Sequence, residues 1–130
     1  MLQRDYIQRL IREFMAALER MLEKKEVESR RELIVALYDK YVGPYSFYQV
    51  ASIDDVLKSF AGIDDNERRM AKIEMLAELY YQEAYLVSKP VTDGLLEKAF
   101  ALFDYLENNG RTYSIQRRMK MNDIKERLQS

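Results

Sequence analysis

The sequence predicts an all-α fold, a bundle of five or six helices. Apolar side chains recur every three or four residues along most of the chain, which is the period of an α-helix. Four glycines and two prolines in 130 residues suit long helices rather than strands and turns. Because the linkers are short, we expect a single domain, 1–130. It would contain N-terminal helices (1–62), a helical hairpin (63–110) and a basic C-terminal helix (111–130).

The first two helices are predicted from their apolar stripes and end signals. Over residues 4–25 the apolar side chains fall within one arc of about 140°, so this helix buries one stripe. Ser29 and Glu32 have the spacing of a capping box, which predicts the start of the second helix. Gly43 and Pro44 predict its end, since proline cannot continue a helix.

A loop and a short helix follow. The aromatic segment 45–50 has little helical pattern, which predicts a loop. Ser52 is placed to cap a short helix, and Gly62 to close it. The acidic run 64–67 opens the next helix by the same capping chemistry.

Residues 66–88 predict the central helix of the bundle. Two apolar arcs on different sides leave only one polar wedge. A helix that is apolar over most of its circumference is buried, so we expect it to pack against more than one neighbour. The polar wedge, which we expect to be solvated, contains Glu74, Glu78, Gln82 and Tyr85.

Two more helices complete the prediction. Thr92 or Asp93 is placed to cap the first, and the segment 108–110, Asn-Asn-Gly, predicts a left-handed turn at its end. Thr112 or Ser114 begins a last helix, which is basic and less regular.

The composition excludes several kinds of site. Cysteine and histidine are both absent, which removes disulfides, thiolate sites, serine–histidine triads and histidine-ligated metals. We therefore expect no enzyme activity, no cofactor and no metal. No apolar run approaches the roughly 20 residues of a membrane span, and the charged N-terminus is unlike a signal peptide. These features predict a cytoplasmic protein that does not enter the membrane.

Charge is unevenly distributed along the chain. The formal net charge is −1, yet residues 1–25 carry +2, residues 26–110 carry −7 and residues 111–130 carry +4. Basic ends that pack on the acidic middle would explain this pattern. The alternative is a basic C-terminal helix that binds nucleic acid, with Tyr113 beside Arg111, Arg117, Arg118, Lys120, Lys125 and Arg127. Asp123 and Glu126 interrupt that run, which favours the first interpretation.

Three groups of acidic residues are candidate sites. Glu83 lies between the two apolar arcs of the central helix, so its carboxylate is expected to be partly desolvated. It is either a general acid–base group or ligand anchor, or else half of a structural buried ion pair, and we favour the pair, with Arg4, Arg9 or Arg12. The i, i+4 pair Glu74 and Glu78 could share a cation, but a solvated face is favoured. Helix-start chemistry accounts for Asp64, Asp65 and Glu67.

An aromatic cluster is the candidate binding surface. Tyr41, Tyr45, Phe47 and Tyr48, with Tyr38 nearby, bring a large apolar area with polar tips. Such a cluster suits either a partner-binding surface or the edge of the core. Packing within the core is favoured, but the predicted loop keeps the binding alternative open.

Part of the chain resembles a tetratricopeptide repeat. Ile73, Leu76, Ala77 and Tyr80 have the spacing of its first helix, and Ala99 and Phe103 that of its second. Ten additional residues separate the two halves. With the opening 1–14 and the segment 77–84, the chain is similar to a family of small uncharacterised bacterial helical proteins that end in such a hairpin. That resemblance implies a bacterial origin, a helical fold and no known activity.

These observations together predict a non-catalytic protein-interaction or scaffold module. The partner would be an unidentified protein, bound in a groove beside the central helix or at the aromatic cluster. A homodimer through an apolar face of the first or central helix is a further expectation. The alternative function is nucleic-acid binding by the C-terminal helix.

Overall fold

A computed structural model describes residues 2–110 and 113–130, with side chains from residue 4 onward. The prediction of a helical bundle is confirmed: the described residues form seven helices and no strand. Their bounds are α1 Leu2–Leu22, α2 Val27–Tyr41, α3 Tyr45–Tyr48, α4 Ile53–Ala61, α5 Asn66–Glu83, α6 Val91–Asn109 and α7 Ile115–Leu128.

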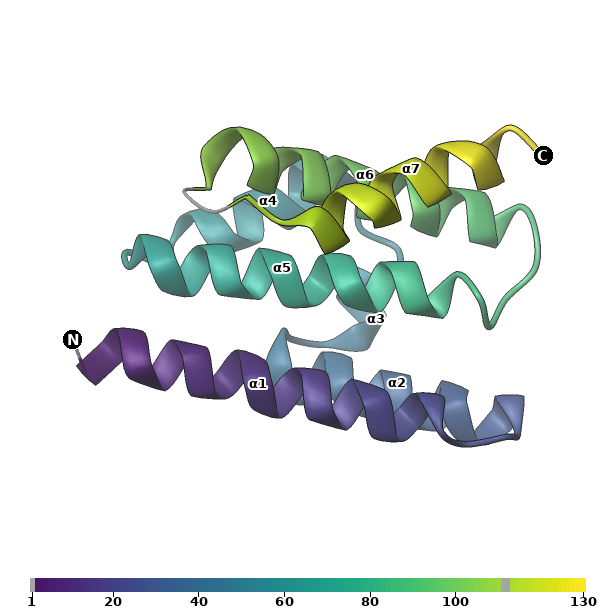
Figure 1. Cartoon of the computed structure of the whole chain (residues 1–130), viewed down its shortest axis with the longest axis horizontal. Coiled ribbons are helices and arrows are strands. Elements are labelled where there is room, and N and C mark those ends of the chain that lie inside the picture. Colours follow the sequence, from purple (N-terminus) through teal and green to yellow (C-terminus); the bar gives the residue numbers. More distant parts are fainter. Residues whose placement is uncertain (1, 111–112) are drawn as a thin grey trace.

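The helices lie in layers around α5 (Figure 1). The antiparallel pair α1 and α2 covers one side of α5, while α4, α6 and α7 lie on the other. Within α5, Leu76, Ala77, Leu79 and Tyr80 are fully buried. The predicted central helix is therefore confirmed, although it ends at Glu83 instead of near residue 88. The apolar core that surrounds α5 includes residues from every helix.

Local capping explains several helix ends. The Ser52 hydroxyl accepts a hydrogen bond from the Asp55 amide at the start of α4, as predicted. The Asp65 carboxylate accepts from the amides of Glu67 and Arg68 at the start of α5. Ser114 caps α7; the alternative cap, Thr112, lies outside the described residues.

Three other predicted helix ends were also wrong. The second helix begins at Val27, so the Ser29–Glu32 capping box is already inside it. Proline at position 90 precedes α6, and the Thr92 hydroxyl donates to the Val87 carbonyl instead of capping an amide. Gly110 ends α6 in an extended conformation, φ −86°, not a left-handed one. A Cβ there would lie 2.6 Å from the Leu106 carbonyl oxygen, so close approach rather than handedness favours glycine.

The aromatic segment after α2 is also more ordered than predicted. In place of a loop, Tyr45–Tyr48 forms the single helical turn α3. Tyr48 stacks on Phe60 with 5.5 Å between ring centroids, and its hydroxyl lies 2.9 Å from that of Ser59. At Gly43 a Cβ would approach the Tyr48 ring to 2.8 Å. The glycine thus lets the chain turn tightly over a ring that is fixed from its other side.

Candidate functional site

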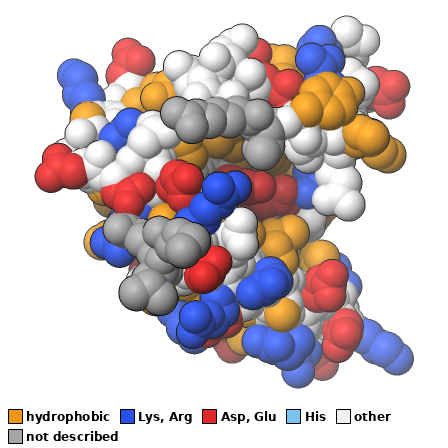
Figure 2. All heavy atoms as spheres, turned by 60° about the vertical axis from the view of Figure 1, so that its left-hand side comes forward, with side chains coloured by type: hydrophobic (Ala, Val, Ile, Leu, Met, Phe, Trp, Pro, Cys, Tyr) orange, Lys and Arg blue, Asp and Glu red, His pale blue; other side chains and the backbone are white. Residues whose placement is uncertain are grey.

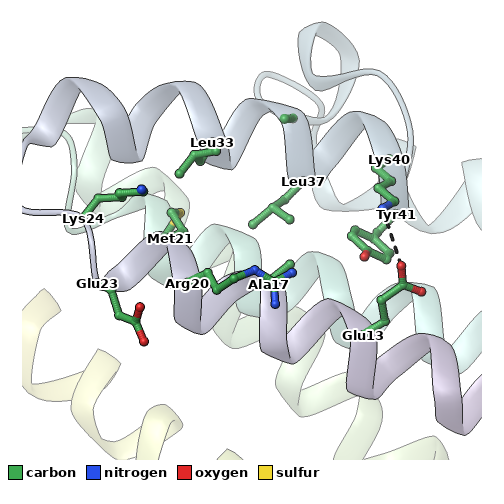
Figure 3. Close-up of a pocket in the computed structure, with 11 residues that line it drawn as sticks. Glu13, Ala17, Arg20, Met21, Glu23, Lys24, Leu33, Leu37, Lys40 and Tyr41 are labelled. Atoms are coloured by element: carbon green, nitrogen blue, oxygen red, sulfur yellow. Dashed lines mark ion pairs between the residues drawn. The ribbon is translucent and has the colours of Figure 1, made fainter.

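A groove lies between α1 and α2, and it encloses about 580 Å³ (Figure 3). Side chains from the two helices point toward one another across it. The apolar lining consists of Ala17, Met21, Leu33, Ala36, Leu37 and Tyr41. Charged side chains form the rim: Glu13, Arg20, Glu23, Lys24 and Lys40.

The floor of this groove is rigid because its large side chains are anchored in the core. Met21 and Tyr41 are 1% and 5% exposed, and the ring of Tyr41 meets Phe14 edge to face, with 5.3 Å between centroids. Ala17 and Ala36, in contrast, are small, so the backbone of an incoming segment could approach closely. Leu33 is 37% exposed and offers an apolar contact on the α2 side.

The connection between the two helices is fixed at one end of the groove. Arg30 Nε donates to the Lys24 carbonyl oxygen at 2.6 Å, and a terminal nitrogen of Arg30 donates to the Leu22 carbonyl oxygen at 3.0 Å. These bonds satisfy carbonyls that the end of α1 leaves free. Farther along, Lys40 Nζ lies 3.5 Å from Glu13 Oε1, an exposed pair that contributes little stability.

Most of the predicted aromatic surface is buried. Tyr41 and Tyr48 are 5% and 6% exposed, and Tyr45 is partly buried; among the four, only Phe47 is exposed, at 41%. The structure therefore does not bring these residues together as one surface. Tyr41 belongs to the α1–α2 groove, Tyr45 faces Glu83, and Tyr48 packs on α4.

Glu83 is buried, but its partners differ from those predicted. The Tyr38 hydroxyl donates to Glu83 Oε1 at 2.7 Å, and the Tyr45 hydroxyl donates to Oε2. Among the described residues, Glu83 forms no ion pair with the arginines proposed for it, Arg4, Arg9 and Arg12. These lie on exposed faces of α1. Hydroxyl donors from α2 and α3 satisfy the carboxylate instead, so the geometry is that of a structural centre.

Lys98 extends this buried polar centre. Its ammonium donates to the carbonyl oxygens of Tyr48, Gln49 and Ala51, at 3.3, 3.0 and 3.1 Å. All three donors of the ammonium are thereby used. The same nitrogen lies 4.6 Å from the centroid of the Tyr80 ring, and the Tyr80 hydroxyl donates to the Tyr48 carbonyl oxygen. Side chains of α5 and α6 thus fix the end of α3.

Two opposing effects act on the pKa of Lys98. Burial lowers the pKa of Lys98, while the negative charge of Glu83 raises it. Sequence reasoning did not find Lys98, because a lone lysine on a helix gives no signal of three distant carbonyls. Because both oxygens of Glu83 accept hydrogen bonds from tyrosine hydroxyls, we assign this centre to stability.

The tyrosines predict a specific response to alkaline pH. Burial raises the pKa of Tyr38, with the charge of Glu83 adding to it, and burial also raises the pKa of Tyr80 and Tyr81. In the unfolded chain these hydroxyls would titrate at about pH 10. The stability they contribute is fully present below that pH and is lost as the pH rises toward their folded pKa values. We expect cooperative unfolding above about pH 10. Tyrosinate absorbance and far-ultraviolet circular dichroism, followed together, check this: titration of all ten tyrosines with the helical signal intact would contradict it.

Part of the polar wedge of α5 is covered, so its predicted solvation was wrong for Glu78. Helix α7 packs beside it, and Glu78 is only 7% exposed. Lys120 Nζ donates to both oxygens of Glu78, at 2.5 and 2.7 Å. The cation that Glu78 meets is therefore a lysine. Glu74, one turn earlier, is partly buried, and Tyr85 of the same wedge is exposed.

Most basic residues of the C-terminal helix α7 form ion pairs with acidic residues of the same molecule. Arg117 Nε donates to Glu107 Oε1 at 2.8 Å, and Arg118 Nε lies 3.4 Å from Glu107 Oε2. The hydrogen bond from Arg117 holds the pKa of Glu107 below its usual range. Arg127 lies 3.9 Å from Asp123 and over the ring of Tyr85. Arg111 lies outside the described residues.

The described part of the chain contains no group of three or more acidic residues that could hold a metal ion. Of the acidic run at the start of α5, Asp65 is used in capping. Comparison of the chain with known protein families, curated proteins and solved structures finds no match. Within the described residues, every helix is too short or too polar to cross a bilayer.

Proposed function

We propose that this protein is a non-catalytic interaction module, and that its α1–α2 groove binds one amphipathic helix of a partner protein. The single observation that carries the proposal is the groove itself. It has an anchored apolar floor and charged rims, and no other described element covers it. Apolar grooves between helices are a common way to bind a partner helix.

The dimensions of the groove favour a helix as the occupant. Its α1 wall extends from Glu13 to Met21, which is about 12 Å, or a little over two helical turns, at 1.5 Å per residue. Ala17 on α1 and Ala36 on α2 are small lining residues, so a third helix could come close to both walls. Apolar residues at positions i, i+3 and i+7 of the partner would meet Met21, Leu33 and Leu37.

Charge at the rim indicates the orientation of the partner. Arg20 and Lys24 lie toward the α1–α2 turn and outnumber the neighbouring Glu23. At the other end, Lys40 is already opposite Glu13. A partner helix with a carboxylate near the Arg20 end would be steered into place, with a modest gain in affinity.

The remaining expectations are part of this proposal. The α5–α6 hairpin would be a tetratricopeptide-like scaffold, with Ile73, Tyr80 and Phe103 in its core, and the location would be the cytoplasm of a bacterium. Because α5 is enclosed by its neighbours, this hairpin presents no groove of its own at its centre. We do not favour nucleic-acid binding, since Arg117, Lys120 and Arg127 are paired within the molecule.

Site-specific photocrosslinking in the source organism tests the proposal. A benzophenone amino acid at Ala36, inside the groove, is expected to capture a distinct protein whose linked segment forms an amphipathic helix. Ala16 is the matched control, because it is exposed on α1 and lies outside the groove. Identical products from the two positions, or capture of a second copy of this chain only, would contradict the proposal.

The captured segment then allows a quantitative prediction. Ala36→Arg places a long charged side chain in the groove and is expected to weaken binding of the purified segment about 30-fold, or about 2 kcal/mol. Ala16→Arg should change binding less than about twofold, since it leaves the groove intact. Calorimetric titration measures both variants, and thermal unfolding shows that both remain folded. Equal effects of the two substitutions would overturn the assignment of the groove.

A further inference from the structure

A second and larger cavity lies at the opposite side of α1. It encloses about 830 Å³ between the N-terminal halves of α1 and α5, the end of α6 and the start of α7. Figure 2 looks toward this end of the molecule, where acidic and basic side chains lie next to apolar ones. The volume is within the range of cavities that bind small organic molecules.

The floor of this cleft is apolar and well packed. Ile7, Ala71 and Leu106 are 5%, 4% and 4% exposed, so α1, α5 and α6 each contribute a buried side chain. Ile11 and Met70 are partly buried and continue the same surface. A ligand with an apolar body could therefore displace water from several side chains at once.

Glu74 is a partly buried acidic residue of the cleft. It lines the cleft from α5, and its carboxylate forms no hydrogen bond or ion pair with another described residue. Its neighbour one turn on, Glu78, has both oxygens bound by Lys120. Burial, with repulsion from Glu78, raises the pKa of Glu74, although Arg117 and Lys120 partly offset this. The ionised carboxylate would thus gain from a cation supplied by a ligand.

We propose that this cleft binds an organic cation, an ammonium group on an apolar body, with Glu74 as the counterion. The apolar part would contact Ile7, Ile11 and Met70, while the ammonium would donate to the Glu74 carboxylate. Asp65 and Glu67, at the same opening, add negative charge that attracts such a ligand.

The basic residues of the cleft do not favour an anion instead. Arg117 is buried and ion-paired with Glu107, so its charge is already neutralised. Arg4 is exposed at the rim and faces a lining that also contains three carboxylates. An anion would therefore meet net negative charge close to an unpaired carboxylate, at a cost that the apolar contacts would have to offset.

Three probes of similar shape test the proposal on the full chain. They are 2-phenylethylamine, which is cationic at neutral pH, neutral 2-phenylethanol and anionic 3-phenylpropanoate. Methyl resonances of Ile7, Ile11 and Met70 report binding in the cleft. We expect the amine to bind at least about tenfold more tightly than the alcohol, as a charge-assisted hydrogen bond would provide, and the anion to bind most weakly.

Two substitutions assign the preference to Glu74. Glu74→Gln keeps the size of the side chain and is expected to remove the advantage of the amine over the alcohol. Glu67→Gln, at the exposed opening, is the control and should reduce that advantage less than about twofold. An amine that binds no better than the alcohol, tighter binding of the anion, an unchanged preference in Glu74→Gln, or no shift of these methyls at millimolar probe would each overturn the proposal. Ala36→Arg, in the other groove, should leave all three affinities unchanged, so failure here is separable from failure of the proposed function.

Discussion

Replacing Glu83 with alanine is expected to lower the free energy of unfolding by about 3 kcal/mol. The carboxylate accepts the hydroxyls of Tyr38 and Tyr45 and is 3% exposed. Its loss would leave the fully buried Tyr38 hydroxyl without an acceptor and open a cavity beside it. Lys98 would also lose the attraction of the negative charge on Glu83. Urea denaturation followed by circular dichroism measures the change.

Two related variants separate the hydrogen bonds from the packing. Glu83→Gln keeps the volume and one acceptor oxygen, so we expect a smaller loss, about 1–2 kcal/mol. Tyr38→Phe combined with Glu83→Ala should cost less than the two single losses together, by about 1 kcal/mol, because each single change strands the other group. Wild-type stability in Glu83→Ala would show that the carboxylate is solvated, and strict additivity would show that the pair is not coupled.

The parts of the fold that could be predicted depend on local chemistry. Ser52 and Asp65 cap their helices through amides only two or three residues away, so their sequence neighbours are sufficient to identify them. The burial of α5 follows from apolar residues on more than one side of a single helix. Where local rules failed, as at Ser29, the helix simply began earlier than the capping signal indicated.

The partners of the polar groups could not be predicted, because they join distant parts of the chain. Tyr38 and Glu83 are 45 residues apart, and Glu78 and Lys120 are 42 apart. A wheel drawn for α5 alone cannot show that α7 will pack on its polar wedge. The helical pattern therefore assigns Glu78 to solvent, although its charge is opposite to that of α7.

The candidate groove illustrates the same limit. The aromatic cluster predicts Tyr41 as a binding residue, whereas its place in the groove follows from the pairing of α1 with α2. Ala17 and Ala36 gave no functional signal, since alanine is ordinary in helices. Their place in the lining of the groove follows only from the pairing of α1 with α2.

Breaking the Lys120–Glu78 pair is expected to be the second largest loss of stability. Lys120→Met removes the cation and leaves Glu78, with its side chain 9% exposed, as an unpaired charge beneath α7. We expect a loss of about 2 kcal/mol, less than for a fully buried pair because the lysine side chain is 23% exposed. Adding Glu78→Met should recover most of this loss, since an apolar pair carries no desolvation cost. Urea denaturation of the three variants tests the order; if the double variant is the least stable, the pair does not act as an isolated ion pair.

Glu74→Gln, one helical turn away, should raise the free energy of unfolding instead of lowering it. Because the pKa of Glu74 is raised in the folded protein, stability is highest while this group is protonated and falls as the pH rises through its folded pKa. The glutamine variant keeps an uncharged group at all pH values, so its free energy of unfolding should equal that of the wild type at about pH 4. At pH 7 it should exceed the wild-type value slightly, by less than about 1 kcal/mol. Denaturation at both pH values measures this difference. A loss of stability at pH 7 would show that the Glu74 charge is already satisfied within the protein, and the cleft would then offer no counterion to a ligand.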